Sequence, residues 1–165
     1  RQYPPKFGTS CMAESRHDTW IADKTIEILQ AINYTGYGSV EFKWDQRDQR
    51  FKVIEVTART WFPHGISTAC GINLVYLAYC DQVGLPKPAV NGFRDGVKWI
   101  HEERDLKSSW QYVRAKEMSV SQWVKSYCGH RTYAVAAWDD PAPILYFLSH
   151  VLSWPWRRIR KFIAS

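Results

Sequence analysis

Residues 40–60 read VEFKWDQRDQRFKVIEVTART. Two runs in which apolar and polar residues alternate flank a short charged centre, and this pattern predicts a β-hairpin. Each run carries one glutamate, Glu41 in the first and Glu55 in the second. The pairing of the two strands therefore decides whether these two carboxylates face each other.

A hairpin that is symmetric about Asp48 brings three pairs of residues onto one face of the sheet, because side chains alternate with period two. The three pairs are Glu41 with Glu55, Lys43 with Val53, and Ser39 with Thr57. Directly opposed side chains have Cβ atoms about 4.5–5.5 Å apart, and like charges at that distance are destabilising. We therefore expect a compensating interaction between the two glutamates.

Three kinds of compensation are open. One carboxylate can take up a proton, as in coupled acid pairs. A basic side chain, Lys43 or Arg59, can lie between the two. A hard divalent cation can bridge them, with the Thr57 hydroxyl as a further oxygen, and Mg²⁺ typically combines one or two carboxylates with water and phosphates. The plainer alternative is a solvent-exposed face on which both glutamates are hydrated.

Composition and charge limit the classes of function. The 165 residues carry a net charge of +6, but Arg157, Arg158, Arg160 and Lys161 crowd into the last nine residues, so the rest of the chain is nearly neutral. This distribution and the absence of a nucleic-acid motif argue against a nucleic-acid partner. The four cysteines form no C-x-x-C pair, which favours reduced thiols in a cytoplasmic protein.

Helical periodicity and breaker residues predict the organisation of the rest of the chain. The expected helices are 19–33 with Asp18 or Thr19 as N-cap, 72–83 as a buried helix stopped by Gly84, 102–117, 119–127, and a last one beginning at 144. The expected additional strands are 97–101 and 131–138. The Pro- and Gly-rich stretch LPKPAVNGFRDG (85–96) is the best boundary, which gives a first domain at 1–90 and an extension at 91–165.

The spacing of the acidic residues resembles a known family. A glutamate on one strand, followed fourteen residues later by E-x-N-x-R, is similar to the C-terminal part of the ATP-grasp domain, here as GYGSVEFKWD and IEVTART. The resemblance covers roughly residues 1–95 and is to carboxylate–amine ligase-like proteins, including short forms related to the carbamoyl-phosphate synthase large subunit. It implies an α+β fold: an antiparallel sheet with packed helices, followed by a mostly helical C-terminal extension.

The resemblance also implies a chemistry. Glu41 and Glu55 would bind the Mg²⁺ ions, or Mn²⁺, that clamp the phosphates of ATP, and Thr57 stands where the family has asparagine. A threonine hydroxyl can also ligate Mg²⁺. Arg59 would meet the transferred phosphoryl group or the carboxylate substrate. The implied enzyme is a ligase that activates a carboxylate through an acyl phosphate for attack by an amine-type acceptor.

Two features suggest that the chain holds only part of such a site. It opens at RQYPPKFG without an initiator Met, and the family needs preceding N-terminal subdomains whose lysines hold the nucleotide. We therefore expect a fragment that is inactive alone. The alternative is a non-catalytic, degenerate ATP-grasp module that associates with a partner protein or a membrane surface.

The C-terminal stretch ILYFLSHVLSWPWRRIRKFIAS (144–165) combines apolar residues, two Trp and a basic cluster. Such a combination can lie at a membrane interface beside anionic headgroups, so peripheral membrane association is one hypothesis. The other is a helix that docks on the domain with its basic end exposed. No apolar run reaches the roughly 20 residues of a transmembrane helix.

Overall fold

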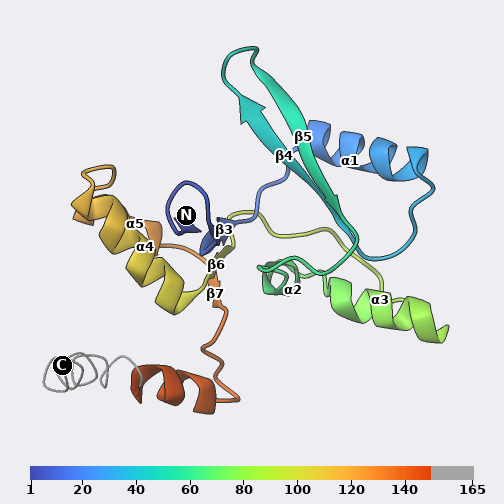
Figure 1. The fold of residues 1–165 in the computed structure, drawn as a ribbon. Helices are drawn as coiled ribbons and strands as arrows, with labels where there is room; N and C mark the ends of the chain where they lie inside the picture. The colour runs from blue at the N-terminus through green and yellow to red at the C-terminus, as the bar shows by residue number, and fades with distance from the viewer. Residues whose placement is uncertain (150–165) are drawn as a thin grey trace, which may run out of the picture.

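The computed structural model describes residues 1–149 and has the predicted α+β class (Figure 1). The strands are β1 (Gln2–Tyr3), β2 (Thr9–Ser10), β3 (Met12–Glu14), β4 (Ser39–Asp45), β5 (Arg50–Thr57), β6 (Lys98–Ile100) and β7 (Arg131–Tyr133). The helices are α1 (Thr19–Ala31), α2 (Gly65–Ala69), α3 (Leu74–Val83), α4 (Glu102–Arg114) and α5 (Val120–Ser126), and residues 142–149 are also helical.

The strands form three small sheets. β1 pairs with β2 and β4 pairs with β5, both antiparallel, while β6 lies between β3, to which it is antiparallel, and β7, to which it is parallel. The pairing of β3 with β6 joins the beginning of the chain to the segment beyond residue 96 (Figure 1). The division near residue 90 stays a prediction, and it falls in a stretch without helix or strand between α3 and β6.

Local capping residues set the ends of two helices. The Asp18 side chain accepts a hydrogen bond from the Ile21 amide at 3.1 Å, which confirms the predicted start of α1. Asn73 accepts one from the Tyr76 amide at 3.0 Å at the start of α3. Gly84 ends α3 with φ at 71°, a left-handed conformation that costs glycine little. The predicted stop at Gly84 is confirmed.

The prediction that this helix is buried is wrong. Within α3 Cys80 is the one buried residue, and four of its large side chains are about half exposed: Val75, Tyr76, Tyr79 and Val83. The helix lies at the edge of the described structure, and no described element covers its outer side (Figure 1). Its apolar composition is therefore not matched by packing within residues 1–149.

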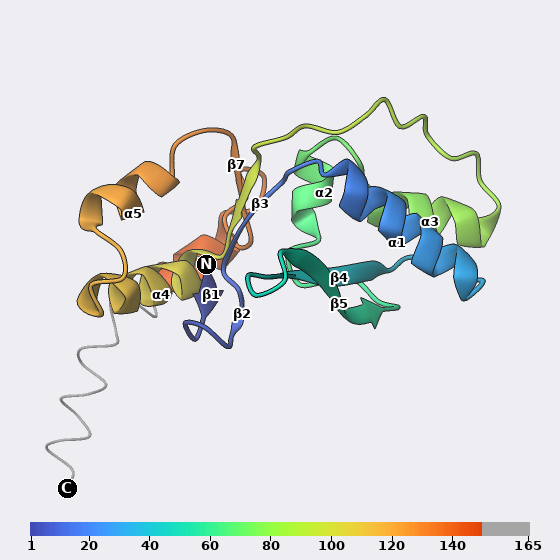
Figure 2. The same cartoon turned by 90° about the horizontal axis from the view of Figure 1, so that it is seen from above.

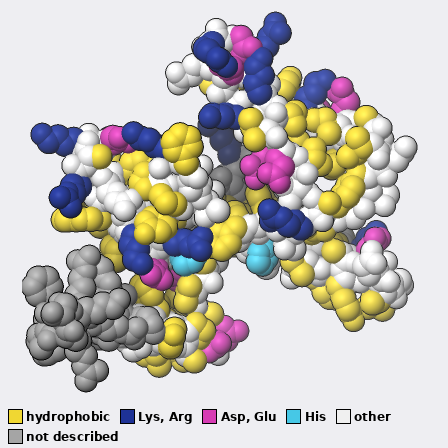
Figure 3. Space-filling view, in the orientation of Figure 1, with side chains coloured by type: hydrophobic (Ala, Val, Ile, Leu, Met, Phe, Trp, Pro, Cys, Tyr) yellow, Lys and Arg dark blue, Asp and Glu magenta, His cyan; other side chains and the backbone are white. Residues whose placement is uncertain are grey.

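The hydrophobic core is small and sits between α2 and the mixed sheet. It consists of Ile66, Cys70, Val97 and Trp99, with Ala13, Trp61 and Ala69 packed against it. Large apolar side chains outside this core stay exposed on α1, β5 and α3, and Figure 3 shows hydrophobic side chains at many places on the visible face of the molecule. Where exposed apolar side chains adjoin one another, they mark contact sites more often than ordinary monomer surface.

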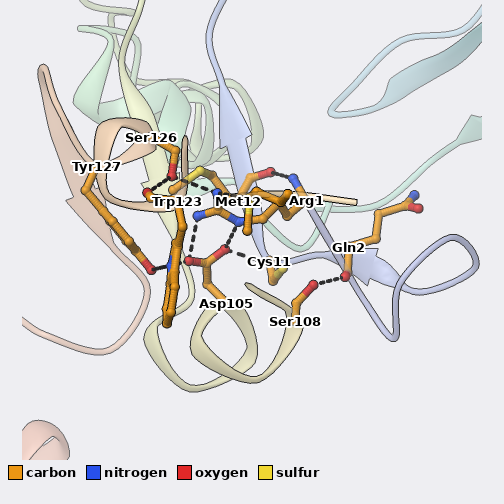
Figure 4. A network of polar contacts seen from close by, with 10 residues as sticks. Arg1, Gln2, Cys11, Met12, Asp105, Ser108, Trp123, Ser126 and Tyr127 are labelled. Atoms are coloured by element: carbon orange, nitrogen blue, oxygen red, sulfur yellow. Dashed lines mark hydrogen bonds and ion pairs between the residues drawn. The ribbon is translucent and has the colours of Figure 1, made fainter. Parts of the chain in front are cut away.

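A buried polar network ties the start of the chain to α4 and α5 (Figure 4). The fully buried Asp105 carboxylate accepts hydrogen bonds from Arg1 Nε at 2.7 Å and Arg1 Nη2 at 2.8 Å, and also from the Tyr127 hydroxyl. The Cys11 thiol lies 3.7 Å from the same carboxylate. Burial, together with the bond to Asp105, raises the pKa of Tyr127. Three segments that are distant in sequence thus meet at one carboxylate.

The C-terminal stretch is described only in part. Residues 142–149 are helical, so the last predicted helix begins two residues earlier than expected. The remaining residues, including the basic cluster on which the membrane hypothesis depends, lie outside the described part of the chain. Among residues 1–149, no helix combines the length and the apolar character that crossing a membrane requires.

Candidate functional site

The hairpin of β4 and β5 confirms the predicted pairing at its base. Glu41 is opposite Glu55, and Ser39 is opposite Thr57. Beyond Glu41 the register shifts, because β5 contains one extra residue, Ile54. Such a β-bulge sets two residues of one strand against one residue of the other.

The bulge corrects one predicted pair. Lys43 lies opposite Lys52 and not opposite Val53, which pairs with Phe42 instead. Because Glu41 and Lys43 are two residues apart on β4, they share a face. That face therefore carries a pair of carboxylates near the base of the hairpin and a pair of ammonium groups nearer its turn.

Helix α1 covers the opposite face of the hairpin. The Trp20 ring lies 5.5 Å from the Phe51 ring in a stacked arrangement and 6.0 Å from the Phe42 ring in an edge arrangement. Figure 2 shows α1 running beside β4 and β5. Because the aromatic residues take the α1 side, the face with the glutamates is directed away from the helix.

The turn of the hairpin is held by its own charged residues. Asp45 accepts hydrogen bonds from the Arg47 amide at 3.1 Å and from the Arg47 guanidinium at 2.7 and 2.9 Å. These bonds lower the pKa of Asp45 to about 2. Lys52 forms an ion pair with Asp48. The two ammonium groups nearest the glutamates thus differ, since Lys52 has an acidic partner and Lys43 has none among the described residues.

The three predicted metal ligands lie together on the hairpin face. The Glu41 and Glu55 side chains are exposed, whereas Thr57 is 7% exposed. The Thr57 hydroxyl donates a hydrogen bond to Glu55 Oε1 at 2.9 Å. This bond orients the Glu55 carboxylate, but it also engages the hydroxyl that was expected to be a metal ligand.

The position directly before β4 requires a glycine, Gly38. A Cβ atom on Gly38 would lie 2.9 Å from the Thr57 backbone oxygen and 3.1 Å from the Tyr34 ring. Both distances are shorter than ordinary van der Waals contact, so a larger residue would displace the end of β5. Gly38 thereby allows Ser39 and Thr57 to pair closely beside the glutamates.

Arg59 follows the end of β5 by two residues. Its side chain is exposed and donates a hydrogen bond to the Thr60 carbonyl oxygen at 3.3 Å. It forms no ion pair with a described residue. The guanidinium therefore keeps donors available for an oxyanion.

The loop after Arg59 is anchored by residues of the C-terminal extension, which the sequence analysis missed. The Phe62 ring packs 5.3 Å from the Trp99 ring and 5.6 Å from the His101 ring. The Arg104 guanidinium lies 4.7 Å above the Phe62 ring, a cation–π contact. No spacing rule links Phe62 to residues about forty positions later, so only the folded chain shows this anchor.

Burial lowers the pKa of His101 in this anchor, and the nearby Arg104 charge adds to the effect. The His101 Nδ1 atom is buried and has no hydrogen-bond partner among the described residues. His64, in the same loop, is exposed, and its Nδ1 atom lies 3.2 Å from the Trp61 carbonyl oxygen. Within residues 1–149 no cluster of three or more His, Cys, Asp or Glu residues could hold a metal ion.

Residues 9–86 match the model of the family described as carbamoyl-phosphate synthase L chain, ATP binding domain. This segment, called the ATP-grasp segment below, is thus similar to part of an ATP-grasp domain. The match includes α1, the hairpin, Arg59 and α3, and it covers a little less than half of the chain. It supports an ATP-binding, ligase-type module for this ATP-grasp segment. The chain matches no curated protein and no solved structure.

Within the ATP-grasp segment, the opposed glutamates occupy the hairpin that the family resemblance singled out. The segment ends shortly after α3, so β6, α4, α5 and β7 lie beyond the matched residues. The extension nevertheless contributes Trp99, His101 and Arg104 to the anchor of the loop that follows Arg59.

Proposed function

We propose that Glu41 and Glu55 hold the Mg²⁺ ions of an ATP site, and that the chain is the metal-binding part of an ATP-dependent carboxylate–amine ligase. The observation that carries this proposal is the direct opposition of the two glutamates on the hairpin face that α1 leaves uncovered. The match of residues 9–86 to an ATP-binding domain supports the same conclusion.

The residues present fit the proposed ion. Mg²⁺ usually takes one or two carboxylates and completes its octahedron with water and substrate phosphates, and this face offers two carboxylates. A bridging cation would also relieve the repulsion between the two like charges. Mn²⁺ favours the same oxygen ligands. Thr57 holds Glu55 in position through its hydrogen bond and can reach the ion through water.

Arg59 is the proposed catalytic residue. In the proposed reaction a carboxylate oxygen of the substrate attacks the γ-phosphorus of ATP and ADP leaves, which gives an acyl phosphate. The amine-type acceptor then attacks the acyl carbon, and phosphate leaves. The bound metal supplies charge neutralisation at the phosphates. The planar, permanently charged Arg59 side chain suits the carboxylate or the phosphoryl group as negative charge moves between them.

The exposed apolar surface of the ATP-grasp segment supports a further element of the proposal. Val53, Ile54 and Val56 on β5 are each at least 40% exposed, and α1 and α3 add further apolar side chains. We assign this surface to contact with the N-terminal ATP-grasp subdomains of the full-length protein. Without these subdomains the chain has the proposed metal-binding face but lacks the residues that would contact the nucleotide from the other side. We therefore expect weak ATP binding and no turnover by the chain alone.

The test is a Mg²⁺-dependent thermal shift of the full-length protein with ATP. We expect a shift in the wild type that disappears in Glu55→Gln and persists in Glu27→Gln, which removes an exposed carboxylate from α1. A shift that survives Glu55→Gln, or one that does not need a divalent cation, would contradict the proposed metal site.

One observation favours a second function, a non-catalytic module that binds a partner. The Thr57 hydroxyl is engaged with Glu55, and threonine is shorter than the asparagine of the family pattern at this position. A wild-type full-length protein without any nucleotide-dependent shift would favour this alternative. A nucleotide-dependent shift that is accompanied by ADP formation with a carboxylate and an amine would exclude it.

A further inference from the structure

A cavity of about 300 Å³ opens beside the core, away from the hairpin. It lies between the end of β3, α2 and the start of α3. Its apolar walls are formed by Trp61, Ile66, Cys70, Ile72, Leu74 and Phe93. Small-molecule sites begin at about this volume, and their walls are mostly apolar with a few polar groups that set orientation. The cavity therefore suits one small, largely apolar ligand.

Most polar groups at the cavity already have partners. The Ser15 hydroxyl donates to the Arg94 carbonyl oxygen at 2.8 Å and accepts from the Val97 amide at 2.9 Å. The Ser67 hydroxyl donates to the His64 carbonyl oxygen at 2.7 Å. Because these hydroxyls are satisfied by the backbone, they do not require a ligand.

Unlike these hydroxyls, the side chains of two charged residues at the cavity, Glu14 and Arg16, have no partner among the described residues. Both are exposed, and the structure gives neither side chain a hydrogen bond or an ion pair with another described residue. Lys98 lies opposite Glu14 in the sheet, but its ammonium donates to the Cys128 carbonyl oxygen at 2.8 Å. A free carboxylate and a free guanidinium thus stand two positions apart at the edge of an apolar cavity.

This combination defines a ligand chemistry. A guanidinium binds a carboxylate through two parallel hydrogen bonds, and a carboxylate accepts hydrogen bonds from an ammonium group. An α-amino acid carries both complementary groups on one carbon atom, and an apolar side chain would fill the cavity. We propose that this cavity binds an α-amino acid with an apolar side chain, with its carboxylate at Arg16, its ammonium group at Glu14, and its side chain against Trp61 and Ile66.

The inference does not rest on nucleotide binding. None of Glu41, Glu55, Thr57 and Arg59 lines the cavity, so the two sites can be tested separately. The nearest link between them is Trp61, which lines the cavity two residues after Arg59.

The experiment is isothermal titration calorimetry of the 165-residue chain with L-leucine and L-phenylalanine. Two analogues of leucine separate the charges: isoamylamine lacks the carboxylate, and 4-methylpentanoate lacks the amine. We expect saturable binding of at least one of the two amino acids. We also expect each leucine analogue to bind about tenfold or more weakly than leucine, since a hydrogen bond to a charged group is lost in each.

Two variants assign the contacts. Arg16→Gln should weaken leucine binding about tenfold or more and leave isoamylamine binding unchanged, because that analogue has no carboxylate. Glu14→Gln should weaken leucine binding similarly and leave 4-methylpentanoate binding unchanged. Both residues are exposed, so we expect unaltered folding, which circular dichroism checks. Arg50→Gln, at an exposed position on the hairpin, and Glu27→Gln are the matched controls.

Three results would overturn the inference: no saturable binding of either amino acid, equal binding of leucine and its two analogues, or leucine affinity that neither Arg16→Gln nor Glu14→Gln changes. Failure of the nucleotide thermal shift would bear only on the proposed ligase function. Loss of amino-acid binding in Arg16→Gln with an intact nucleotide shift would confirm that the two sites are separate.

Discussion

Glu41 and Glu55 lie directly opposite each other in the β4–β5 register, and neither forms an ion pair with a described Lys, Arg or His residue. The one direct hydrogen bond that the structure gives to this pair comes from the Thr57 hydroxyl. Neither Lys43 nor Arg59 forms an ion pair with either glutamate, so the bridging base considered from the sequence is not present among the described residues. Both side chains are exposed to solvent, so hydration of the two carboxylates and the proposed bridging cation are the alternatives that experiments on this pair distinguish.

The first prediction separates the electrostatic repulsion within the Glu41–Glu55 pair from the proposed role of the pair in metal binding. Glu41→Gln removes one of two like charges, so in metal-free buffer we expect the free energy of unfolding to rise by about 0.2–1 kcal/mol. The same variant should weaken Mg²⁺-dependent ATP binding by the full-length protein. Urea unfolding and nucleotide titration measure the two effects. An unchanged stability together with unchanged nucleotide binding would show that both glutamates are simply hydrated.

The second prediction concerns Thr57. Thr57→Val keeps the shape of the buried side chain but removes the hydroxyl that donates to Glu55. We expect a loss of about 0.5–1.5 kcal/mol of stability and weaker Mg²⁺ binding, because Glu55 is no longer held in one orientation. The control is Thr68→Val, at an exposed position on α2. Equal effects of the two variants on Mg²⁺ affinity would rule out an orienting role for the hydroxyl.

The third prediction concerns the buried network in Figure 4. Asp105→Ala leaves the Arg1 guanidinium, whose side chain is 11% exposed, without its carboxylate partner. Removing one member of a buried pair costs about 3–5 kcal/mol, and denaturant unfolding measures it. Asp81→Ala, which removes an exposed ion pair with Lys87, should cost about 1 kcal/mol or less. Similar costs for the two variants would mean that the network does not hold the extension to the start of the chain.

The fourth prediction is a pH dependence. The pKa of His101 is lowered below its usual value of 6.5, first by burial and then by Arg104. The unfolded chain therefore binds a proton more readily than the folded chain. The stability contribution of neutral His101 is fully present above pH 6.5 and is lost as the pH falls below that value.

His101→Phe keeps a ring against Phe62 and Trp99 but cannot be protonated. We expect its thermal midpoint to vary less than that of the wild type between pH 7 and pH 5. His130→Phe, at an exposed position, should follow the wild-type profile. If His101→Phe has the same pH profile as the wild type, the titration of this ring does not contribute to stability.

Much of the candidate site could be predicted from the sequence because its determinants are local. Alternation identified the hairpin, and symmetry about its polar turn gave the pairing of Glu41 with Glu55. Neither alternation nor symmetry could predict the bulge at Ile54, which sets Lys43 opposite Lys52. A bulge adds one residue to one strand of the pair, and alternation within each strand does not reveal where that residue is added. The burial of α3 was also predicted wrongly, since apolar composition does not say whether another element covers a helix.

The sequence alone determined the elements whose signals lie within a few residues: the N-cap at Asp18, the stop at Gly84 and the opposed glutamates of the hairpin. Tertiary structure alone decided the contacts between distant segments. These include the bond from Arg1 to Asp105, 104 positions later, and the packing of Phe62 against Trp99 and His101. The physical reason is the separation along the chain of the groups that interact. Caps and alternation act through neighbouring backbone groups, whereas burial and ion pairing depend on which surfaces meet after the chain has folded.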